Sequence, residues 1–260
     1  MCLIALAWQR STRLPLLVAA NRDEAHARPT LAAHEWPERA GVFGGKDLQE
    51  GGSWMALSAD GRLAAVTNVR ERPVRRGARS RGHLVRDFML DGRTAADAAV
   101  DIVARAGEFG PFNLLLTDGV ELVLVTNRPV PGWQRLPPGV YAVSNGVYGS
   151  AWPKIRRLYG VMSEIAAQLH ATQGESHVDA LLRALGSTDA APDHELPDTG
   201  VGLDAERQLS PIFVTGDEYG TRASSVALLT DTGAGSFVER SYGPGGVCTG
   251  EQRLVLQRPA

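Results

Sequence analysis

Cysteine and lysine are scarce in this chain of 260 residues, and long apolar runs are absent. The only cysteines are Cys2 and Cys248, so a scaffold of several disulfides is excluded. No stretch approaches the ~18 consecutive apolar residues of a membrane helix, and we expect a soluble, cytoplasmic protein. The 27 basic and 29 acidic residues leave a net charge of −2. This argues against a nucleic-acid partner, because nucleic-acid-binding domains are usually strongly basic.

The remaining composition is that of an ordinary globular protein. Hydrophobic residues make up 43% of the chain and charged residues 22%, which is enough to build a full core. The 29 glycines and 15 prolines predict many short elements joined by turns. No repeat or linker divides the sequence, so we expect a single domain over residues 1–260.

Short apolar runs with β-branched or aromatic residues predict strands. They lie at residues 3–8, 15–20, 54–58, 62–68, 112–117, 121–126, 139–143, 225–230 and 236–241. Two Asp-Gly pairs, Asp60-Gly61 and Asp118-Gly119, predict hairpin turns, because Asp-Gly tolerates the positive φ values that such turns require.

Helices are predicted from the spacing of apolar residues and from capping signals. They cover residues 82–90, 94–106, 153–169 and 176–185. Hairpins and helices come in blocks rather than in strict alternation, which favours antiparallel sheets with helices on their outer faces. Residues 186–211 are rich in Asp, Pro and Gly, and we expect a long loop or lid there.

Cys2 is the first candidate catalytic residue. Removal of Met1, which is normal before a small second residue, makes Cys2 the N-terminus of the mature chain. The α-amine has a reference pKa of about 7.7–8.0 and can act as a base near neutral pH, and the thiolate is a nucleophile. One residue then supplies both groups, as in N-terminal-nucleophile hydrolases. The alternative is an inert buried thiol.

Four polar residues, Asn21-Arg22-Asp23-Glu24, directly follow the apolar segment 14–20. An arginine beside a cysteine stabilises the thiolate, and a carboxylate can anchor an α-ammonium group. The alternation of a strand turns Asn21 and Asp23 to one face and Arg22 and Glu24 to the other. The pattern does not decide which pair faces Cys2, and an ordinary charged turn is the alternative.

Three further residues are candidate donors to a developing oxyanion. Asn68 ends one predicted strand, Asn145 follows another, and Arg222 precedes the strand expected from Ser225. For each of them the alternative is an ordinary turn residue. Two glycine pairs, Gly44-Gly45 and Gly51-Gly52, lack the spacing of a phosphate loop and are interpreted as turns before a buried Trp54.

Seven arginines are concentrated within 17 residues, namely Arg70, Arg72, Arg75, Arg76, Arg79, Arg81 and Arg86. The cluster is either a solvated loop or a binding site for a phosphate or carboxylate, since Arg binds such groups in a bidentate manner. The six histidines form no metal-binding motif, so no metal site is predicted. Haem remains a candidate ligand, because one His or Cys can serve as its axial ligand.

Taken together, these short motifs resemble the NRDE family, which is the transport and Golgi organisation protein family. The matching segments run over nearly the whole chain: Met1-Cys2, Asn21-Arg22-Asp23-Glu24, Arg28-Pro29, Gly51-Gly52-Ser53-Trp54, Ala64-Ala65-Val66-Thr67-Asn68, Ser80-Arg81-Gly82, Phe112-Asn113-Leu114, Val143-Ser144-Asn145, Trp152-Pro153-Lys154 and Tyr219-Gly220-Thr221-Arg222. Through that family the chain is similar to cysteine N-terminal-nucleophile hydrolases such as penicillin V acylase, bile salt hydrolase and acid ceramidase.

The resemblance implies an α+β fold, a four-layer αββα sandwich of antiparallel sheets. It also implies that Cys2 is the nucleophile, that Asn68 and Asn145 hold the oxyanion, and that Arg222 flanks the nucleophile. The early arginine and aspartate of the hydrolases are separated by two residues, whereas Arg22 and Asp23 are adjacent here. We assign binding roles to the remaining candidates, Asn21, Glu24, Trp54, Arg70 and Arg81.

Two functions are compatible with this resemblance. The first is an amidase or acyltransferase that acts on a small acyl substrate through Cys2 and needs no cofactor. The second is a carrier that binds haem or acyl-coenzyme A in the same pocket without chemistry. The oligomeric state is not predicted.

Overall fold

Two antiparallel sheets form the centre of the molecule. The computed structural model describes residues 2–169 and 174–257. The first sheet has six strands, in the order β10 (Gly139–Val143), β1 (Cys2–Trp8), β2 (Leu16–Ala25), β11 (Tyr219–Leu229), β12 (Gly235–Tyr242) and β13 (Cys248–Leu256). The second has seven, in the order β3 (Thr30–Glu35), β4 (Val42–Asp47), β5 (Met55–Ser58), β6 (Arg62–Asn68), β7 (Phe112–Asp118), β8 (Leu122–Thr126) and β9 (Gly132–Leu136).

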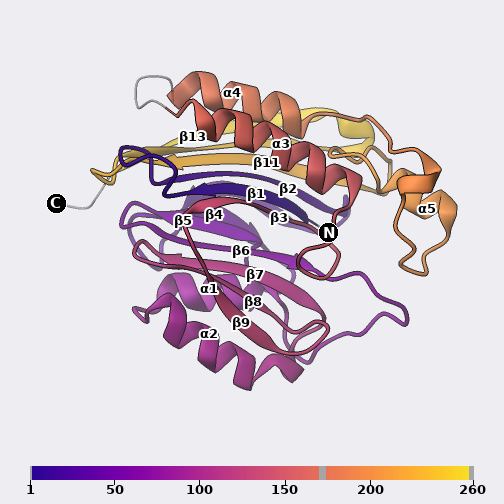
Figure 1. The fold of residues 1–260 in the computed structure, drawn as a ribbon, viewed down its shortest axis with the longest axis horizontal. Coiled ribbons are helices and arrows are strands. Elements are labelled where there is room, and N and C mark those ends of the chain that lie inside the picture. Colours follow the sequence, from indigo (N-terminus) through magenta and orange to yellow (C-terminus); the bar gives the residue numbers. More distant parts are fainter. Residues whose placement is uncertain (1, 170–173, 258–260) are drawn as a thin grey trace.

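Helices cover the outer face of each sheet (Figure 1). On the six-stranded sheet lie α3 (Pro153–Ala167) and α4 (Gly174–Leu185). On the seven-stranded sheet lie α1 (Gly82–Leu90) and α2 (Ala95–Ala104). The short helix α5 (Leu203–Gln208) lies at one end of the molecule. The predicted four-layer αββα sandwich is therefore confirmed.

The alternation of side chains in β1 links three of the four layers. Leu3 and Ala5 belong to the apolar cluster beneath the helices, where β1 contacts α3, whereas Ile4 and Leu6 belong to the apolar core between the sheets. All four are buried, as expected for a strand with an apolar layer on each face. The same alternation directs the side chain of Cys2 into the space between the sheets.

Local signals in the sequence produce the expected turns and helix start. The two Asp-Gly pairs connect β5 to β6 and β7 to β8, and their glycines, Gly61 and Gly119, have φ values of 94° and 89°. The helix α2 begins after Thr94, whose hydroxyl accepts a hydrogen bond of 3.1 Å from the N–H of Asp97. This contact is a standard N-cap.

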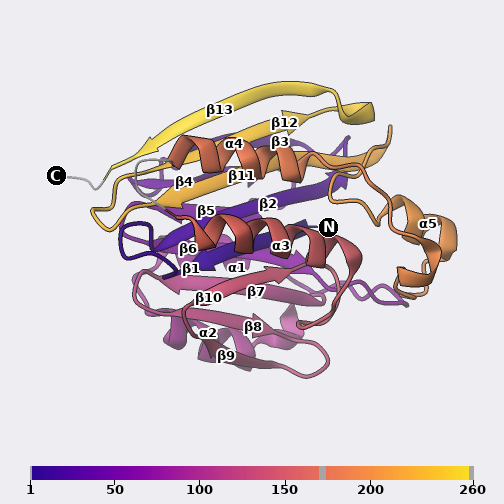
Figure 2. The same ribbon diagram turned by 45° about the horizontal axis from the view of Figure 1, so that its top comes forward.

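The sequence interpretation missed four strands, β3, β4, β9 and β13. Gly44-Gly45 lies within β4, so its interpretation as a turn is wrong. A Cβ atom on Gly45 would lie 2.1 Å from Cη2 of Trp54, so this glycine makes room for the indole. The strand β13 was not predicted because its residues are mostly exposed and polar and give no apolar pattern. It is an edge strand of its sheet (Figure 2).

Two other expectations need correction. Residues 186–211 contain α5 and the short 3₁₀ turn Asp193–Glu195. Arg222 does not precede its strand but lies inside β11, where the pairing with β2 is irregular.

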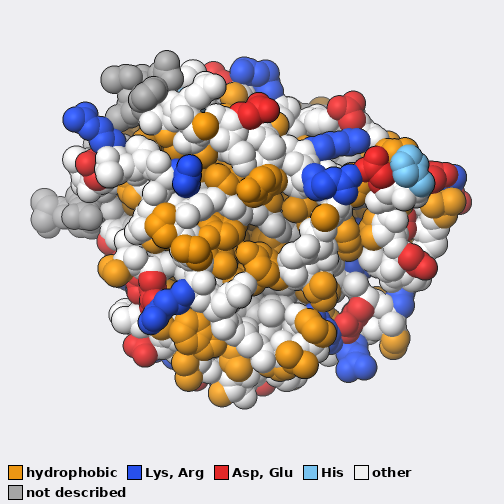
Figure 3. All heavy atoms as spheres, viewed as in Figure 1, with side chains coloured by type: hydrophobic (Ala, Val, Ile, Leu, Met, Phe, Trp, Pro, Cys, Tyr) orange, Lys and Arg blue, Asp and Glu red, His pale blue; other side chains and the backbone are white. Residues whose placement is uncertain are grey.

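The surface has a mixed charge pattern on the face seen in Figure 1. Basic and acidic side chains are interspersed there around a central area of apolar side chains (Figure 3). No helix in the described ranges is long and apolar enough to cross a membrane.

Candidate active site

Cys2 begins β1 at one end of the six-stranded sheet. It is paired with Arg22 of β2 across the strands, and its carbonyl oxygen accepts a hydrogen bond of 2.9 Å from Ser144 Oγ. The strand β2 pairs with Cys2 itself, whereas β10 pairs with β1 only from Ile4 onward. The backbone of Cys2 is therefore held by β2 on one side and by the hydroxyl of Ser144, which follows β10, on the other.

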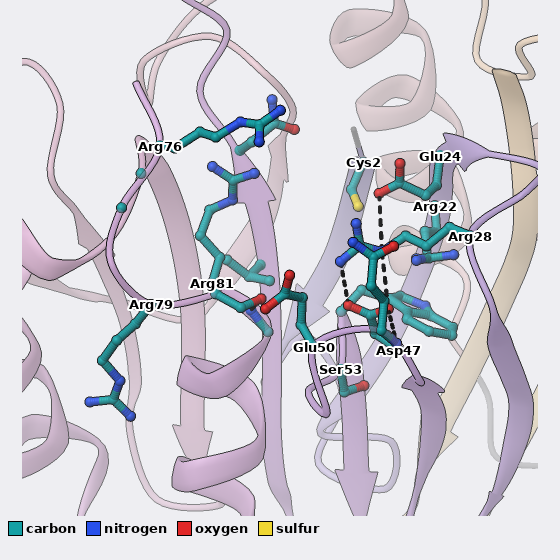
Figure 4. A pocket seen from close by; sticks show the side chains of 18 of the residues that line it. Cys2, Arg22, Glu24, Arg28, Asp47, Glu50, Ser53, Arg76, Arg79 and Arg81 are labelled. Carbon is teal, nitrogen blue, oxygen red and sulfur yellow. Dashed lines mark hydrogen bonds and ion pairs between the residues drawn. The ribbon is translucent and has the colours of Figure 1, made fainter. Parts of the chain in front are cut away.

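A cavity of about 590 Å³ opens in front of Cys2. Its walls come from the ends of β1 and β2, from the segment 47–54 and from the segment 74–82. The candidate site residues that line it are Cys2, Arg22, Asp23, Glu24, Trp54, Asn68 and Arg81. Figure 4 shows the sulfur of Cys2 on one wall, with Arg76 and Arg81 on the opposite wall. Sequence positions separated by about 80 residues thus meet at one site.

Arg22 is buried directly beside the thiol. Its side chain stacks on the ring of Trp54 at 4.5 Å and donates a hydrogen bond of 3.3 Å to Thr30 Oγ1. Burial raises the pKa of the Cys2 thiol, while the positive charge of Arg22 lowers it. Because burial is the larger effect, the thiol is protonated at neutral pH and needs a base before it can attack a carbonyl.

The two faces of the Asn21–Glu24 segment have different surroundings. Asn21 donates hydrogen bonds of 2.8 and 2.9 Å to the carbonyls of Leu185 and Ile212, and it accepts one from Ser224. It thus ties β2 to the helical layer and does not line the cavity. Its expected binding role has no support in this placement.

Asp23 and Glu24 both reach the cavity. Asp23 is almost fully buried, and its Oδ1 accepts a hydrogen bond of 2.7 Å from Thr221 Oγ1. Glu24 lies 3.9 Å from Arg28, which forms two hydrogen bonds of 3.0 and 2.6 Å with Asp47. Negative charge is therefore present near Cys2 on both sides of β2.

Asn68 and Asn145 lie next to each other, but only Asn68 lines the cavity. Asn145 is fully buried, and its Nδ2 donates to the backbone oxygen and to Oδ1 of Asn68, at 3.0 Å each. These two bonds use both hydrogens of the Asn145 amide. They also fix the amide of Asn68 so that its own Nδ2 is available to a ligand. Asn145 is suited to positioning Asn68 rather than to direct contact.

A buried polar network holds the segment that carries Asn145. Asn113 Nδ2 donates to the carbonyls of Ser144 and Gly146 at 3.2 and 2.9 Å, and Thr67 Oγ1 donates to Ser144 at 2.8 Å. Asn113 lies in the Phe112-Asn113-Leu114 motif, and no role was predicted for it from the sequence. Its position on a predicted buried strand was the available signal, since a buried amide must find partners.

Arg70 and Arg222 have structural partners away from the cavity. Arg222 donates to the carbonyls of Ala25, His26 and Arg28 at 2.8–3.1 Å, so it closes the turn after β2. The guanidinium of Arg70 forms a buried ion pair of 2.6 Å with Glu206. The backbone N–H of Arg70 donates a hydrogen bond of 2.6 Å to the carbonyl of Asn145. Neither guanidinium is among the described groups that line the cavity.

The arginine cluster divides into paired and unpaired members. Arg79 also lines the cavity, but its guanidinium forms ion pairs with Asp87 and Glu108 at 2.9 and 3.3 Å. Arg81 lines the cavity without a carboxylate partner among the described residues, and burial lowers its pKa, an effect that the nearby Cys2 and Glu24 oppose. The cavity therefore offers positive charge to an anionic group.

Lys154 is a buried amine to which no role was assigned from the sequence. It lies in the first turn of α3 and is 2% exposed. The available signal was its residue type, because the chain has 25 arginines and only two lysines, so a lysine at a given position is unusual. Within residues 2–169 and 174–257, no group of His, Cys, Asp and Glu side chains is arranged to hold a metal ion.

The sandwich places the chain in a known fold class. The structure aligns with a mutant conjugated bile acid hydrolase from Clostridium perfringens at a TM-score of 0.52, over 98% of this chain and 92% of that one, at 6% sequence identity. At such low identity the likeness concerns the fold alone. The chain has the N-terminal-nucleophile hydrolase fold.

Sequence comparison defines the family more closely. The family described as transport and Golgi organisation 2 matches residues 1–244. The homologue from Bos taurus is 31% identical over 241 residues, which cover 87% of this chain and 86% of the homologue. The protein from Drosophila melanogaster is 28% identical over 256 residues. The chain therefore belongs to the transport and Golgi organisation 2 family, as its motifs predicted.

Proposed function

We propose that this protein, after removal of Met1, is a cysteine N-terminal-nucleophile enzyme that hydrolyses or transfers a small acyl group from an amide or thioester. The observation that carries the proposal is the shared cavity of Cys2 and Asn68. It brings a nucleophile and an unused amide donor to the same space. Arg81 on the opposite wall has no carboxylate partner among the described residues, which supports an acyl substrate that also bears an anionic group.

The proposed reaction begins at the buried thiol. The α-amine of Cys2 takes the thiol proton, and the sulfur attacks the substrate carbonyl carbon. The carbonyl oxygen becomes an oxyanion, which accepts a hydrogen bond from Asn68 Nδ2. The carbon–nitrogen bond then breaks, and the departing amine takes the proton held by the α-ammonium group. For a thioester, the departing group is a thiol.

The thioester left on Cys2 is resolved by water or by an amine. The α-amine removes a proton from this second nucleophile, which attacks the thioester carbon. The carbon–sulfur bond breaks, and the sulfur regains its proton from the α-ammonium group. Water yields a carboxylic acid, whereas an amine yields a new amide, so the acceptor decides between hydrolysis and acyl transfer.

A second function follows from the arginine-rich lining of the cavity. A carrier of haem or acyl-coenzyme A needs positive charge for propionates or phosphates, and it needs no nucleophile. Among the described residues that line the cavity, Cys2 is the one whose side chain can ligate haem iron. Haem binding therefore also depends on Cys2, but binding of acyl-coenzyme A does not.

Intact-mass analysis with an acyl probe separates the two functions. We expect the purified chain to lack Met1 and to gain one acyl group from an activated N-acyl or thioester probe. Cys2→Ala abolishes this adduct, while Cys248→Ala, which removes the exposed thiol, leaves it unchanged. Retention of Met1, or an adduct that survives Cys2→Ala, contradicts the enzymatic proposal.

A binding assay tests the carrier directly. If no probe acylates Cys2, a haem titration that shifts the Soret band in the wild type but not in Cys2→Ala supports the carrier. Acyl-coenzyme A binding that is equal in the wild type and in Cys2→Ala supports it as well. Turnover that is lost in Cys2→Ala favours the enzyme.

A further inference from the structure

The seven arginines of the segment 70–86 differ in whether a carboxylate balances their charge. Four of them have such a partner at 2.6–3.7 Å: Arg70 pairs with Glu206, Arg75 with Glu71, Arg79 with Asp87 and Glu108, and Arg86 with Asp87. Arg72, Arg76 and Arg81 have none in the described part of the chain, and of these three Arg76 and Arg81 line the cavity. A guanidinium remains charged at physiological pH. The wall opposite Cys2 therefore carries two positive charges with which no described carboxylate pairs.

Close packing between two short segments builds this wall. A Cβ on Gly77 would lie 2.4 Å from the backbone nitrogen of Gly110, so glycine is required for the two backbones to approach this closely. Beside this contact, the backbone N–H of Arg79 donates a hydrogen bond of 3.0 Å to the carbonyl of Glu108. Arg76 directly precedes Gly77 and is therefore attached to a segment that is anchored at the cavity wall.

Arg81 is held at the same wall by the segment 110–111. Its Nη1 donates a hydrogen bond of 3.4 Å to the carbonyl of Pro111, and it would lie 2.8 Å from a Cβ on Gly110. The missing side chain of Gly110 thus makes room for the guanidinium. A guanidinium has five N–H donors, and the carbonyl of Pro111 is the one acceptor that Arg81 finds among the residues that the structure describes. The other donors remain available to a ligand in the cavity.

The size and the lining of the cavity indicate which molecules fit between Cys2 and this wall. The volume of about 590 Å³ is typical of a site for a small molecule. Of the described lining residues, the apolar side chains larger than alanine are Trp54, Val66 and Val74, and Arg22 already stacks on the ring of Trp54. Few apolar surfaces remain for a long hydrocarbon chain, so the lining favours a compact, polar substrate.

We infer that Arg76 and Arg81 form an anion-binding site on the wall that faces Cys2, and that they select compact acyl substrates with a carboxylate or phosphate at the end remote from the reacting carbonyl. The inference rests on the proposed function, in which Cys2 and Asn68 hold that carbonyl. The two arginines are then specificity-determining residues. Arginine suits this task, because its planar guanidinium donates two parallel hydrogen bonds to a carboxylate or phosphate.

The test compares two thiol reagents of opposite charge on Cys2. They are 2-sulfonatoethyl methanethiosulfonate, which is anionic, and 2-(trimethylammonio)ethyl methanethiosulfonate, which is cationic. The chain carries Cys248→Ser, so that Cys2 is the only thiol, and each rate is expressed relative to the rate with free cysteine. At an ionic strength of about 0.15 M, where distant charges are screened, we expect the anionic reagent to react about tenfold faster or more, as in clefts lined by positive charge.

Substitutions test the two arginines separately. Arg76→Met and Arg81→Met are each expected to lower this charge preference by about threefold or more, and the double variant is expected to abolish it. Arg72→Met is the matched control, because it removes an arginine of the same segment that does not line the cavity. Arg76 is exposed, so its variant keeps the test valid if Arg81→Met does not fold. No preference in the wild type, or an equal loss in Arg72→Met, overturns the inference.

Competing anions distinguish a binding site from a diffuse positive field. Inorganic phosphate or acetate, added at constant ionic strength, is expected to slow the anionic reagent in a saturable manner in the wild type but not in the double variant. Stronger competition by phosphate supports a substrate that bears a phosphate, and stronger competition by acetate supports one that bears a carboxylate. Absence of saturable competition by either anion overturns the inference.

Failure of the inference and failure of the proposed function give different results. The thiol reagents need neither removal of Met1 nor turnover, so a charge preference without any acyl adduct contradicts the proposed function and leaves the anion-binding site intact. Where the adduct forms, a glutaryl thioester is expected to acylate Cys2 about tenfold faster or more than its methyl ester, and the double variant is expected to remove this difference. Equal rates with the two probes in the wild type contradict only the inference.

Discussion

The buried ion pair between Arg70 and Glu206 gives the sharpest prediction about stability. The side chains are 7% and 4% exposed, and the charged atoms lie 2.6 Å apart. Glu206 also accepts hydrogen bonds of 2.9 and 2.5 Å from the N–H and the hydroxyl of Thr199. Removing Glu206 therefore leaves the buried charge of Arg70 and two donors of Thr199 without their acceptor.

The expected cost can be estimated from these contacts. Breaking a buried pair by removing one partner costs about 3–5 kcal/mol, and an unsatisfied buried donor adds roughly 1–3 kcal/mol. Glu206→Gln, which keeps an oxygen for Thr199, is expected to lose about 3 kcal/mol. Glu206→Leu is expected to lose about 4–6 kcal/mol. The double variant Arg70→Met with Glu206→Leu removes both charges and is expected to regain about half of that loss.

Urea unfolding followed by circular dichroism measures these differences. With a slope of about 2–3 kcal/mol per molar urea, Glu206→Leu lowers the midpoint by about 2 M. Glu195→Gln is the matched control, because its pair with Arg156 is half exposed and exposed pairs contribute about 0–1 kcal/mol. A loss below about 1 kcal/mol for Glu206→Leu, or a double variant no better than the single one, refutes the reasoning.

Two further predictions concern buried groups elsewhere in the sandwich. Burial raises the pKa of Glu239, so the stability that its protonated form contributes is full below the unfolded pKa and is lost as the pH rises through the folded pKa. Glu239→Gln is expected to remove this pH-dependent loss. Urea midpoints that decline equally in both proteins from pH 4 to 8 contradict the prediction. A Cβ on Gly45 would overlap Trp54 at 2.1 Å, so Gly45→Ala is expected to cost about 1–3 kcal/mol by overpacking. A Cβ on Gly92 would meet no atom beyond its chain neighbours within 4 Å, so Gly92→Ala is expected to show no loss of stability in the same assay.

The layered fold was predictable because its signals are local. Helix caps such as Thr94, Asp-Gly turns and apolar spacing each depend on a few neighbouring residues. The missed strand β4 shows the limit of such signals. Its Gly44-Gly45 pair resembles a turn, and only Trp54, which arrives from the next segment of chain, explains why glycine is required in a strand.

The candidate site was predictable in its residue types but not in its contacts. The alternation of Arg22 and Asp23 along a strand could be stated in advance, whereas the face that meets Cys2 depends on where the helices pack. The partner of Arg70 lies 136 residues away in sequence, and Arg222 serves a turn that belongs to another strand. Pairings of this kind are set by the tertiary fold, and no short pattern encodes them.

The inner position of β1 in its sheet has a practical consequence for handling the protein. Chain termini usually fray, but β1 is hydrogen-bonded on both sides, and its first residue faces the cavity. A purification tag placed before Cys2 is attached next to a residue that lines the cavity. The strand β13 ends at the opposite end of the molecule (Figures 1 and 2), so a tag after Leu256 keeps both the terminus and the cavity clear.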